Sequence, residues 1–327
     1  PILAKDNFER IISETKEADI HYVIQQSSVR KSELKAEDIA ELEDFVKLAN
    51  EEANKEFKGI EVSAYASPDG PEKLNERLSE QRKKSADKYL AKVIGKTKVS
   101  KEDAETLYNL KSTAEDWDGF KGLVEASSIE DKDLILRVLS MYSDPVVREK
   151  EIKNISATYK VLADDILPQL RRSDIVVKVD KIGYSDEELI ELATNNPDTL
   201  NIEELLYAAK LVDGLEAKAA VYQKATEKYE GCFRARNNLG FIQLRMGNLT
   251  DAKASFEKAN ELKEGNAIVT NNLGVIALME GDKETAQKHF LNATDAGNAV
   301  DYNMGILKIM DGEYEAAVNY FQNHKEF

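Results

Sequence analysis

The alternation of hydrophobic and polar positions divides the first hundred residues into helices and strands. Ile39, Leu42 and Val46 recur at the spacing of one helical face, whereas Ile60 and Val62 alternate with polar residues as in a half-buried strand. The pattern predicts, in order, a lead-in helix within residues 1–16, a strand at 18–26, a helix at 35–56, a strand at 59–65 and a helix from Pro71. This order favours an α/β sandwich.

The next segment, residues 95 to about 170, has helical spacing throughout. A strand follows at 173–184, where Ile175, Val177 and Val179 alternate with polar residues. We interpret this strand as completing the sheet, which makes the helical segment an insertion within the sandwich. A helical subdomain followed by an edge strand would give a similar pattern.

From residue 185 onward the pattern is helical and repeats itself. Leu205, Leu239 and Leu273 are spaced by 34 residues, Phe256 and Phe290 have the same spacing, and a third copy follows at a spacing of 31. A 34-residue helix–turn–helix repeat is the signature of the tetratricopeptide (TPR) family. The sequence therefore predicts an all-α TPR solenoid over 185–327, with the two phenylalanines buried between paired helices.

One cation interrupts the apolar stripe of the helix from Pro71. Leu74, Leu78 and Ala86 lie on one helical face, and Arg82 stands in line with them. The stem of an arginine can cover apolar surface, but its guanidinium needs a partner. That partner is either a carboxylate of the protein or a carboxylate of a ligand.

The residues around Arg82 carry a resemblance to a known family. The segment 62–90 resembles the C-terminal, peptidoglycan-binding domain of the OmpA family, in a variant found in the Bacteroidetes. The resemblance covers residues 17–94 and 171–184, and the matching positions are Tyr65, Gly70, Asn75, Leu78, Ser79, Arg82, Tyr89 and Leu90. It implies an OmpA-like domain over 17–184 with the helical insertion at about 95–170, and a Gram-negative periplasmic location at the outer membrane or wall.

The resemblance also implies a ligand site. In the family, an aspartate in the loop and an arginine in the helix hold the diaminopimelate of the peptidoglycan stem peptide. The arginine corresponds to Arg82, and a guanidinium–carboxylate pair suits such a ligand. The family's aspartate corresponds to Ser67, which carries no charge. Asp69 and Asn75 complete the candidate site, although Asp69 is also a residue that such a turn requires.

The repeats carry a second candidate site. Asn238, Asn272 and Asn303 occupy equivalent repeat positions, and Asn237 and Asn271 precede two of them. In TPR proteins this position faces the concave groove, where side-chain amides can bind an extended peptide backbone. Inter-repeat packing is the alternative role.

Composition narrows the classes of function. The chain has 327 residues and a formal net charge of −16, which argues against a nucleic-acid partner because phosphate binding relies on clustered Lys and Arg. No stretch approaches the roughly 18 apolar residues of a membrane helix. The single Cys232 excludes an internal disulfide, the three histidines lack the spacing of a metal pair, and no nucleotide-binding or nucleophile motif is present. We expect no cofactor, no metal and no enzymatic activity.

These observations predict an α+β chain, an OmpA-like sandwich followed by a TPR solenoid, from a gene product that extends before Pro1 and beyond Phe327. We expect a non-catalytic envelope protein that binds peptidoglycan through the first domain and an unidentified protein through the repeats. The alternative is a TPR interaction scaffold whose OmpA-like domain no longer binds peptidoglycan.

Overall fold

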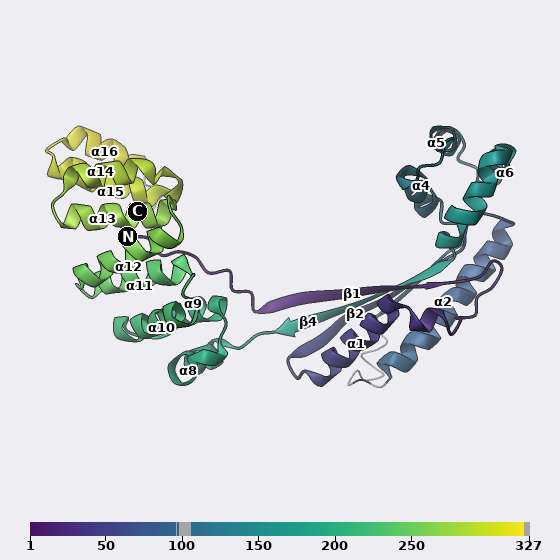
Figure 1. Ribbon diagram of the computed structural model, residues 1–327, viewed down its shortest axis with the longest axis horizontal. Coiled ribbons are helices and arrows are strands. Elements are labelled where there is room, and N and C mark those ends of the chain that lie inside the picture. The colour runs from purple at the N-terminus through teal and green to yellow at the C-terminus, as the bar shows by residue number, and fades with distance from the viewer. Residues whose placement is uncertain (96, 98–105, 324–327) are drawn as a thin grey trace. The chain divides into compact units, whose positions relative to one another are not determined.

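The computed structural model describes residues 1–95, 97 and 106–323, and its chain forms two compact units (Figure 1). The sheet unit is Ile11–Gly183, and the repeat unit combines Pro1–Arg10 with Tyr184–Phe327. The N-terminal ten residues therefore belong to the repeat unit, although the sheet unit separates them from it in sequence.

The sheet unit is built on four strands in the order β1-β4-β2-β3. Their bounds are Ile11–His21 for β1, Lys55–Tyr65 for β2, Tyr108–Thr113 for β3 and Arg172–Ile182 for β4. β4 lies between β1 and β2 and is antiparallel to both, whereas β3 runs parallel to β2 at the edge. The strand predicted at 173–184 thus completes the sheet from its interior.

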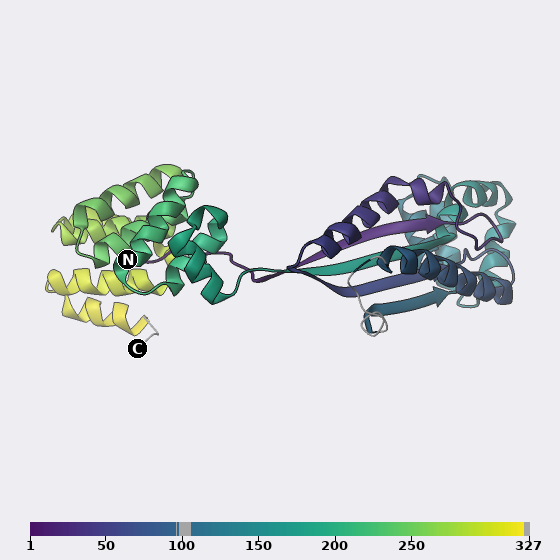
Figure 2. The ribbon, with the colours of Figure 1, turned by 90° about the horizontal axis from the view of Figure 1, so that it is seen from below.

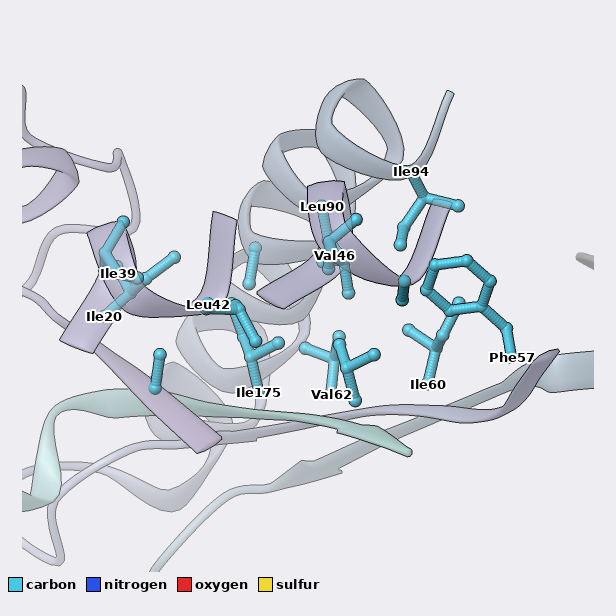
Figure 3. Packing of buried hydrophobic residues seen from close by; sticks show 14 of the residues in the cluster. Ile20, Ile39, Leu42, Val46, Phe57, Ile60, Val62, Leu90, Ile94 and Ile175 are labelled. Carbon is cyan, nitrogen blue, oxygen red and sulfur yellow. The ribbon is translucent and has the colours of Figure 1, made fainter. Parts of the chain in front are cut away.

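Two helices pack against the sheet and enclose its core. α1 (Glu37–Glu51) and α2 (Glu72–Ile94) lie over the same face, as Figure 2 shows. Their apolar stripes meet the inward side chains of β2 and β4, among them Ile60, Val62 and Ile175, each fully buried (Figure 3). The hydrophobic periodicity in the sequence identified this core because each element buries one face.

The prediction of a lead-in helix over residues 1–16 is wrong. Residues 1–9 form no helix, and Ile11–His21 is the strand β1, which starts seven residues before the strand predicted at 18–26. Phe8, Ile11 and Ile12 have helical spacing, but Ile11 and Ile12 are 55% and 48% exposed. Their extended conformation follows from pairing with β4, a segment far away in sequence.

The insertion is also not helical throughout, because β3 lies within residues 95–170. Most of its residues are exposed, and its apolar alternation is limited to Tyr108 and Leu110, which is too short to reveal the strand. Residues 96 and 98–105 of the predicted insertion lie outside the described residues. From Trp117 onward the insertion is largely helical and has its own core, which includes Phe120, Ile135 and Leu162. Its helices are α4 (Trp117–Ala126), α5 (Lys132–Met141), α6 (Pro145–Asn154) and α7 (Ser156–Val161), followed by short helical turns over Leu162–Leu170.

The repeat unit is a stack of helix pairs in sequence order (Figure 1). α8 (Asp186–Asn195) precedes the pairs. The pairs are α9 (Ile202–Leu211) with α10 (Leu215–Lys228), α11 (Phe233–Arg245) with α12 (Leu249–Leu262), α13 (Ala267–Met279) with α14 (Lys283–Asn292), and α15 (Asn298–Met310) with α16 (Tyr314–Asn323).

In the pairs α11–α12 and α13–α14, a phenylalanine of the second helix packs against a glycine of the first helix. Phe256 and Phe290 are fully buried, as predicted. A Cβ at Gly240 would lie 2.9 Å from the Phe256 ring, and one at Gly274 would lie 2.6 Å from the Phe290 ring. The glycines are therefore required for the close approach of the two helices in a pair.

Candidate functional site

The loop between β2 and α2 borders a small pocket, here called the loop pocket. Gly70, with φ at +113°, turns the chain, and Pro71 leads into α2. The pocket is small, with a cavity volume of about 60 Å³. Its polar lining includes Ser67, Asp69, Asn75, Arg82 and Arg171. All four residues of the predicted peptidoglycan site therefore line one pocket.

Arg82 is 1% exposed and is held by backbone carbonyl groups. Its Nη1 donates to the carbonyl oxygen of Tyr65 at 2.8 Å, and its Nε donates to that of Gln26 at 3.0 Å. The guanidinium also lies 5.1 Å from the centre of the Tyr22 ring. Burial lowers the pKa of Arg82 to about 10. Among the described residues, no carboxylate forms an ion pair with Arg82, so the buried cation is held by dipoles and a ring face.

A second arginine that the sequence analysis missed lies in the same pocket. Arg171 is 7% exposed, and its Nε donates to the Ser67 hydroxyl at 3.2 Å. Its Nη2 lies 3.3 Å from an Asp69 carboxylate oxygen, and the Ser67 hydroxyl donates to the other Asp69 oxygen. The available signal in the sequence was the Arg171–Arg172 pair at the start of the last strand.

The helical insertion holds the loop in place. The Gly70 N–H donates to a Glu149 carboxylate oxygen at 2.6 Å, from helix α6. The Asn75 amide donates to the Gly70 carbonyl at 3.4 Å and to Glu115 at 3.3 Å. Asn75 therefore supports the loop conformation.

The pocket as a whole favours an anionic group. It contains the two guanidinium groups of Arg82 and Arg171 against the single carboxylate of Asp69. Because Asp69 is already paired with Arg171, the chemistry left for a ligand is that of Arg82. A carboxylate is the natural partner of a buried guanidinium.

The second candidate site is the row of five asparagines predicted on the repeats, here called the asparagine row. Asn237 and Asn238 lie on α11, Asn271 and Asn272 on α13, and Asn303 on α15, and all are at most 9% exposed. Their side chains form a continuous chain of hydrogen bonds. The amide of each residue donates to the side-chain oxygen of the next, in the order Asn303, Asn271, Asn272, Asn237 and Asn238. The network fixes the orientation of each amide.

An extended peptide already lies on the asparagine row, and it is the protein's own N-terminal segment, Pro1–Arg10, here called the strap. Asn238 bonds both backbone groups of Ala4, accepting from its N–H at 2.8 Å and donating to its carbonyl at 2.9 Å. Asn272 bonds both backbone groups of Ile2, at 2.6 and 2.7 Å. Asn237 adds a bond to the Ile2 carbonyl at 3.1 Å.

The structure therefore brings the predicted groove residues to a peptide backbone and also packs them into an inter-repeat network. Within the described part of the chain, the side chains of Asn271 and Asn303 bond to other asparagines of the row and not to the strap. The strap was missed by sequence reasoning because its apolar spacing imitates a helix. No local signal identifies the repeats as its binding surface.

Side chains on α9 and α8 hold the remainder of the strap. Asp6 forms an ion pair with Lys210, and the Asn7 N–H donates to Glu203 at 2.6 Å. The rings of Phe8 and Tyr207 stack, with their centres 4.4 Å apart. Arg10 forms an ion pair with Asp186 at the end of the strap.

The ionisation of Asp6 favours the docked strap. Burial raises the pKa of Asp6, whereas the hydrogen bonds from the Lys210 ammonium and the Phe8 N–H lower it. The lowering is the larger effect, so the pKa of Asp6 lies below its ordinary value. The Arg234 guanidinium likewise lowers the pKa of Glu203. Asp6 of the strap is therefore charged where it meets Lys210, and Glu203 is charged where it accepts the Asn7 N–H.

The described residues include no group of three or more His, Cys, Asp and Glu side chains placed to hold a metal ion. No helix within them has the length and apolar character needed to span a bilayer.

Comparison with known proteins identifies one repeat directly. A model of the tetratricopeptide repeat family matches residues 233–266, which contain α11 and α12. Similar solved structures include a MamA protein, with 17% identity over 42% of this chain and 80% of that chain and a TM-score of 0.36. Another is a thermophilic TPR protein of Thermus thermophilus, with 10% identity over 43% of this chain and 90% of that chain and a TM-score of 0.37. No curated protein matches the chain.

Proposed function

We propose that the protein is a non-catalytic component of a Gram-negative periplasm, associated with the outer membrane or the cell wall. In this proposal the sheet unit binds the diaminopimelate-containing stem peptide of peptidoglycan, and the repeats bind a protein. The matched TPR repeat indicates a protein-interaction scaffold. The wall-binding half rests on the loop pocket.

The observation that carries wall binding is the state of Arg82. A purely structural arginine buried to this depth is expected to pair with a carboxylate, since burying an unpaired charge is costly. Arg82 instead donates to two carbonyl groups beside a pocket and keeps its positive charge without a paired carboxylate among the described residues. A carboxylate brought by a ligand would complete the site.

A second candidate function is a TPR scaffold whose sheet unit binds no peptidoglycan. Its support is the loop composition, because Ser67 replaces the aspartate of the resembling family and Arg171 already neutralises Asp69. A ligand ammonium group would then find no unpaired carboxylate in the loop. Under this alternative Arg82 only ties the loop to the sheet.

Sedimentation with purified sacculi separates the two functions. Sacculi whose stem peptides contain diaminopimelate should bind the protein, whereas sacculi with lysine at that position lack the second carboxylate and should bind at least about tenfold more weakly. Arg82→Lys should remove most of the difference, because an ammonium cannot form the bidentate contact. Arg77→Ala, an exposed arginine on the same helix, is the matched control and should bind as the wild type does.

The loop itself supplies a complementary variant. Ser67→Asp would place a second carboxylate near Arg171 and strengthen binding if the ligand carries an ammonium group. Equal sedimentation with both types of sacculi, unchanged by Arg82→Lys, would reject carboxylate recognition. Absence of sedimentation for both the wild type and Ser67→Asp would favour the scaffold function.

A further inference from the structure

The strap presents its residues to the repeats with a strict alternation. From Ala4 to Arg10, the even-numbered residues are buried or half-buried, whereas Lys5, Asn7 and Glu9 are exposed. A period of two is that of an extended chain lying on a surface. The repeats therefore contact every second side chain of the strap from Ala4 to Arg10.

The asparagine row recognises the backbone of the strap in a repeating register. Asn238 and Asn272 are equivalent residues of consecutive repeats, and they bond Ala4 and Ile2, which are two residues apart. Each asparagine uses its amide oxygen and nitrogen on the N–H and the carbonyl of one residue. This geometry is a side-chain version of the pairing by which a strand is added to a sheet edge.

Beyond the asparagine row, the repeats bind side chains of the strap. Lys210 meets the carboxylate of Asp6, and the Tyr207 ring stacks on Phe8. Ala4 is 5% exposed, so its small side chain is buried against the repeats. The surface thus selects a small residue, an acid, an aromatic residue and a base at successive even positions.

We propose that the asparagine row is a receptor for an extended segment and that the strap is its resident intramolecular ligand. A protein partner binds this surface by displacing the strap. The partner segment has a small residue, followed at two-residue intervals by an acidic, an aromatic and a basic residue. This inference rests on the protein-binding half of the proposed function and is independent of wall binding.

The contacts of the strap make displacement feasible. Residues 1–9 of the strap form no helix or strand. Side chains of the repeats bond the backbone of the strap at a few positions, among them Ile2, Ala4 and Asn7. Since the strap is joined covalently to β1, it acts at a high effective concentration. A free segment of equal affinity therefore binds the intact protein poorly until the strap is weakened.

The test uses a synthetic peptide of residues 1–10, labelled at its C-terminal end, and fluorescence anisotropy with the full chain. We expect weak binding to the wild type. Asp6→Lys in the protein opposes Lys210 with a like charge, releases the strap, and should tighten peptide binding by at least about tenfold. Glu9→Lys in the protein makes the same charge change at an exposed position and should leave binding within about twofold of the wild type.

The same substitutions in the peptide should act with the opposite sign. Against the Asp6→Lys protein, a peptide carrying Asp6→Lys should bind at least about tenfold more weakly, whereas a Glu9→Lys peptide should bind as the unaltered peptide does. Methylation of the Ala4 backbone nitrogen removes the donor to Asn238 and should also abolish binding. This last variant tests the backbone register without any change to the protein.

The outcomes decide the proposal separately from wall binding. Equal peptide binding by the wild type and the Asp6→Lys protein would overturn self-occupation. If the Asp6→Lys and Glu9→Lys peptides lost affinity equally, net charge alone would explain the binding of the peptide. That result would overturn the specific register. Circular dichroism of each protein confirms its folding, and a chain shortened to start at Ile11 provides a second receptor without the strap. Failure of the peptide to bind this folded, shortened chain would also overturn the proposal.

Discussion

The contact between Gly274 and Phe290 offers a quantitative test of how the repeats are packed. Phe290 is fully buried, so Phe290→Ala should destabilise the repeat unit by about 3–5 kcal/mol through lost transfer energy and a residual cavity. Gly274→Ala would place a methyl group 2.6 Å from the ring. The resulting strain costs about 1–3 kcal/mol, partly offset by the better helix propensity of alanine, which is worth up to about 1 kcal/mol.

The two substitutions should compensate each other. In the double variant the methyl group at residue 274 enters the space that the ring has left, so the total loss should be smaller than the sum of the single losses by at least about 1 kcal/mol. Urea titration followed by circular dichroism measures all three variants, with the transition of the repeat unit analysed separately from that of the sheet unit.

Additive losses, within about 0.5 kcal/mol, would show that the ring and the glycine are not in contact and would refute this account of helix pairing. A loss below about 1 kcal/mol for Phe290→Ala alone would show that the ring is not enclosed. Phe290→Leu is a useful control, because it retains much of the buried volume and should cost less than the alanine variant.

Three further predictions follow from the same structure. Phe256→Ala should cost about 3–5 kcal/mol in urea titration, since Phe256 closes the preceding repeat in the same way. Because the pKa of Asp6 is lowered in the docked strap, docking should be strongest above the ordinary value near 3.9 and should weaken as the pH falls toward the lowered pKa. Anisotropy of the labelled peptide on the shortened chain from about pH 6 to about pH 3 should show this loss. A peptide with Asp6→Asn should show a smaller loss, because Glu203, which accepts the Asn7 N–H, also has a lowered pKa. Arg82→Ala should destabilise the sheet unit by about 2–3 kcal/mol in thermal unfolding, because two part-buried hydrogen bonds from a charged donor are lost, whereas Arg77→Ala should change it by less than about 0.5 kcal/mol.

Local sequence was sufficient where an element buries one regular face. The stripes of α1 and α2, the alternation of β2 and the 34-residue spacing of Phe256 and Phe290 all reflect burial against neighbouring elements. Arg82 was recognised as a candidate because it interrupts the apolar stripe of α2. The asparagine row was recognised because its members occupy equivalent positions in successive repeats. In these cases the periodicity of one segment contains the information about its environment.

Local sequence was insufficient where distant segments decide the conformation. The first half of β1 contains exposed isoleucines, and most residues of β3 are exposed, so neither segment has the pattern of a buried element. Only the second half of β1, with the buried Ala18 and Ile20, lies in the strand predicted at 18–26. The conformation of β1 and β3 comes from backbone pairing with β4 and β2, and such pairing leaves no periodic trace in side chains that face solvent.

The candidate sites divide in the same way. The sequence by itself determined the helical framework of the repeats and the identity of Arg82 and the five asparagines as candidates. Only the tertiary structure brought Arg171 beside Ser67 and Asp69, and only the tertiary structure laid Ile2 and Ala4 on the asparagine row. The bonds of Asn238 and Asn272 reach backbone groups more than 230 residues away, and backbone groups are the same in every residue, so no residue type marks the strap as their partner.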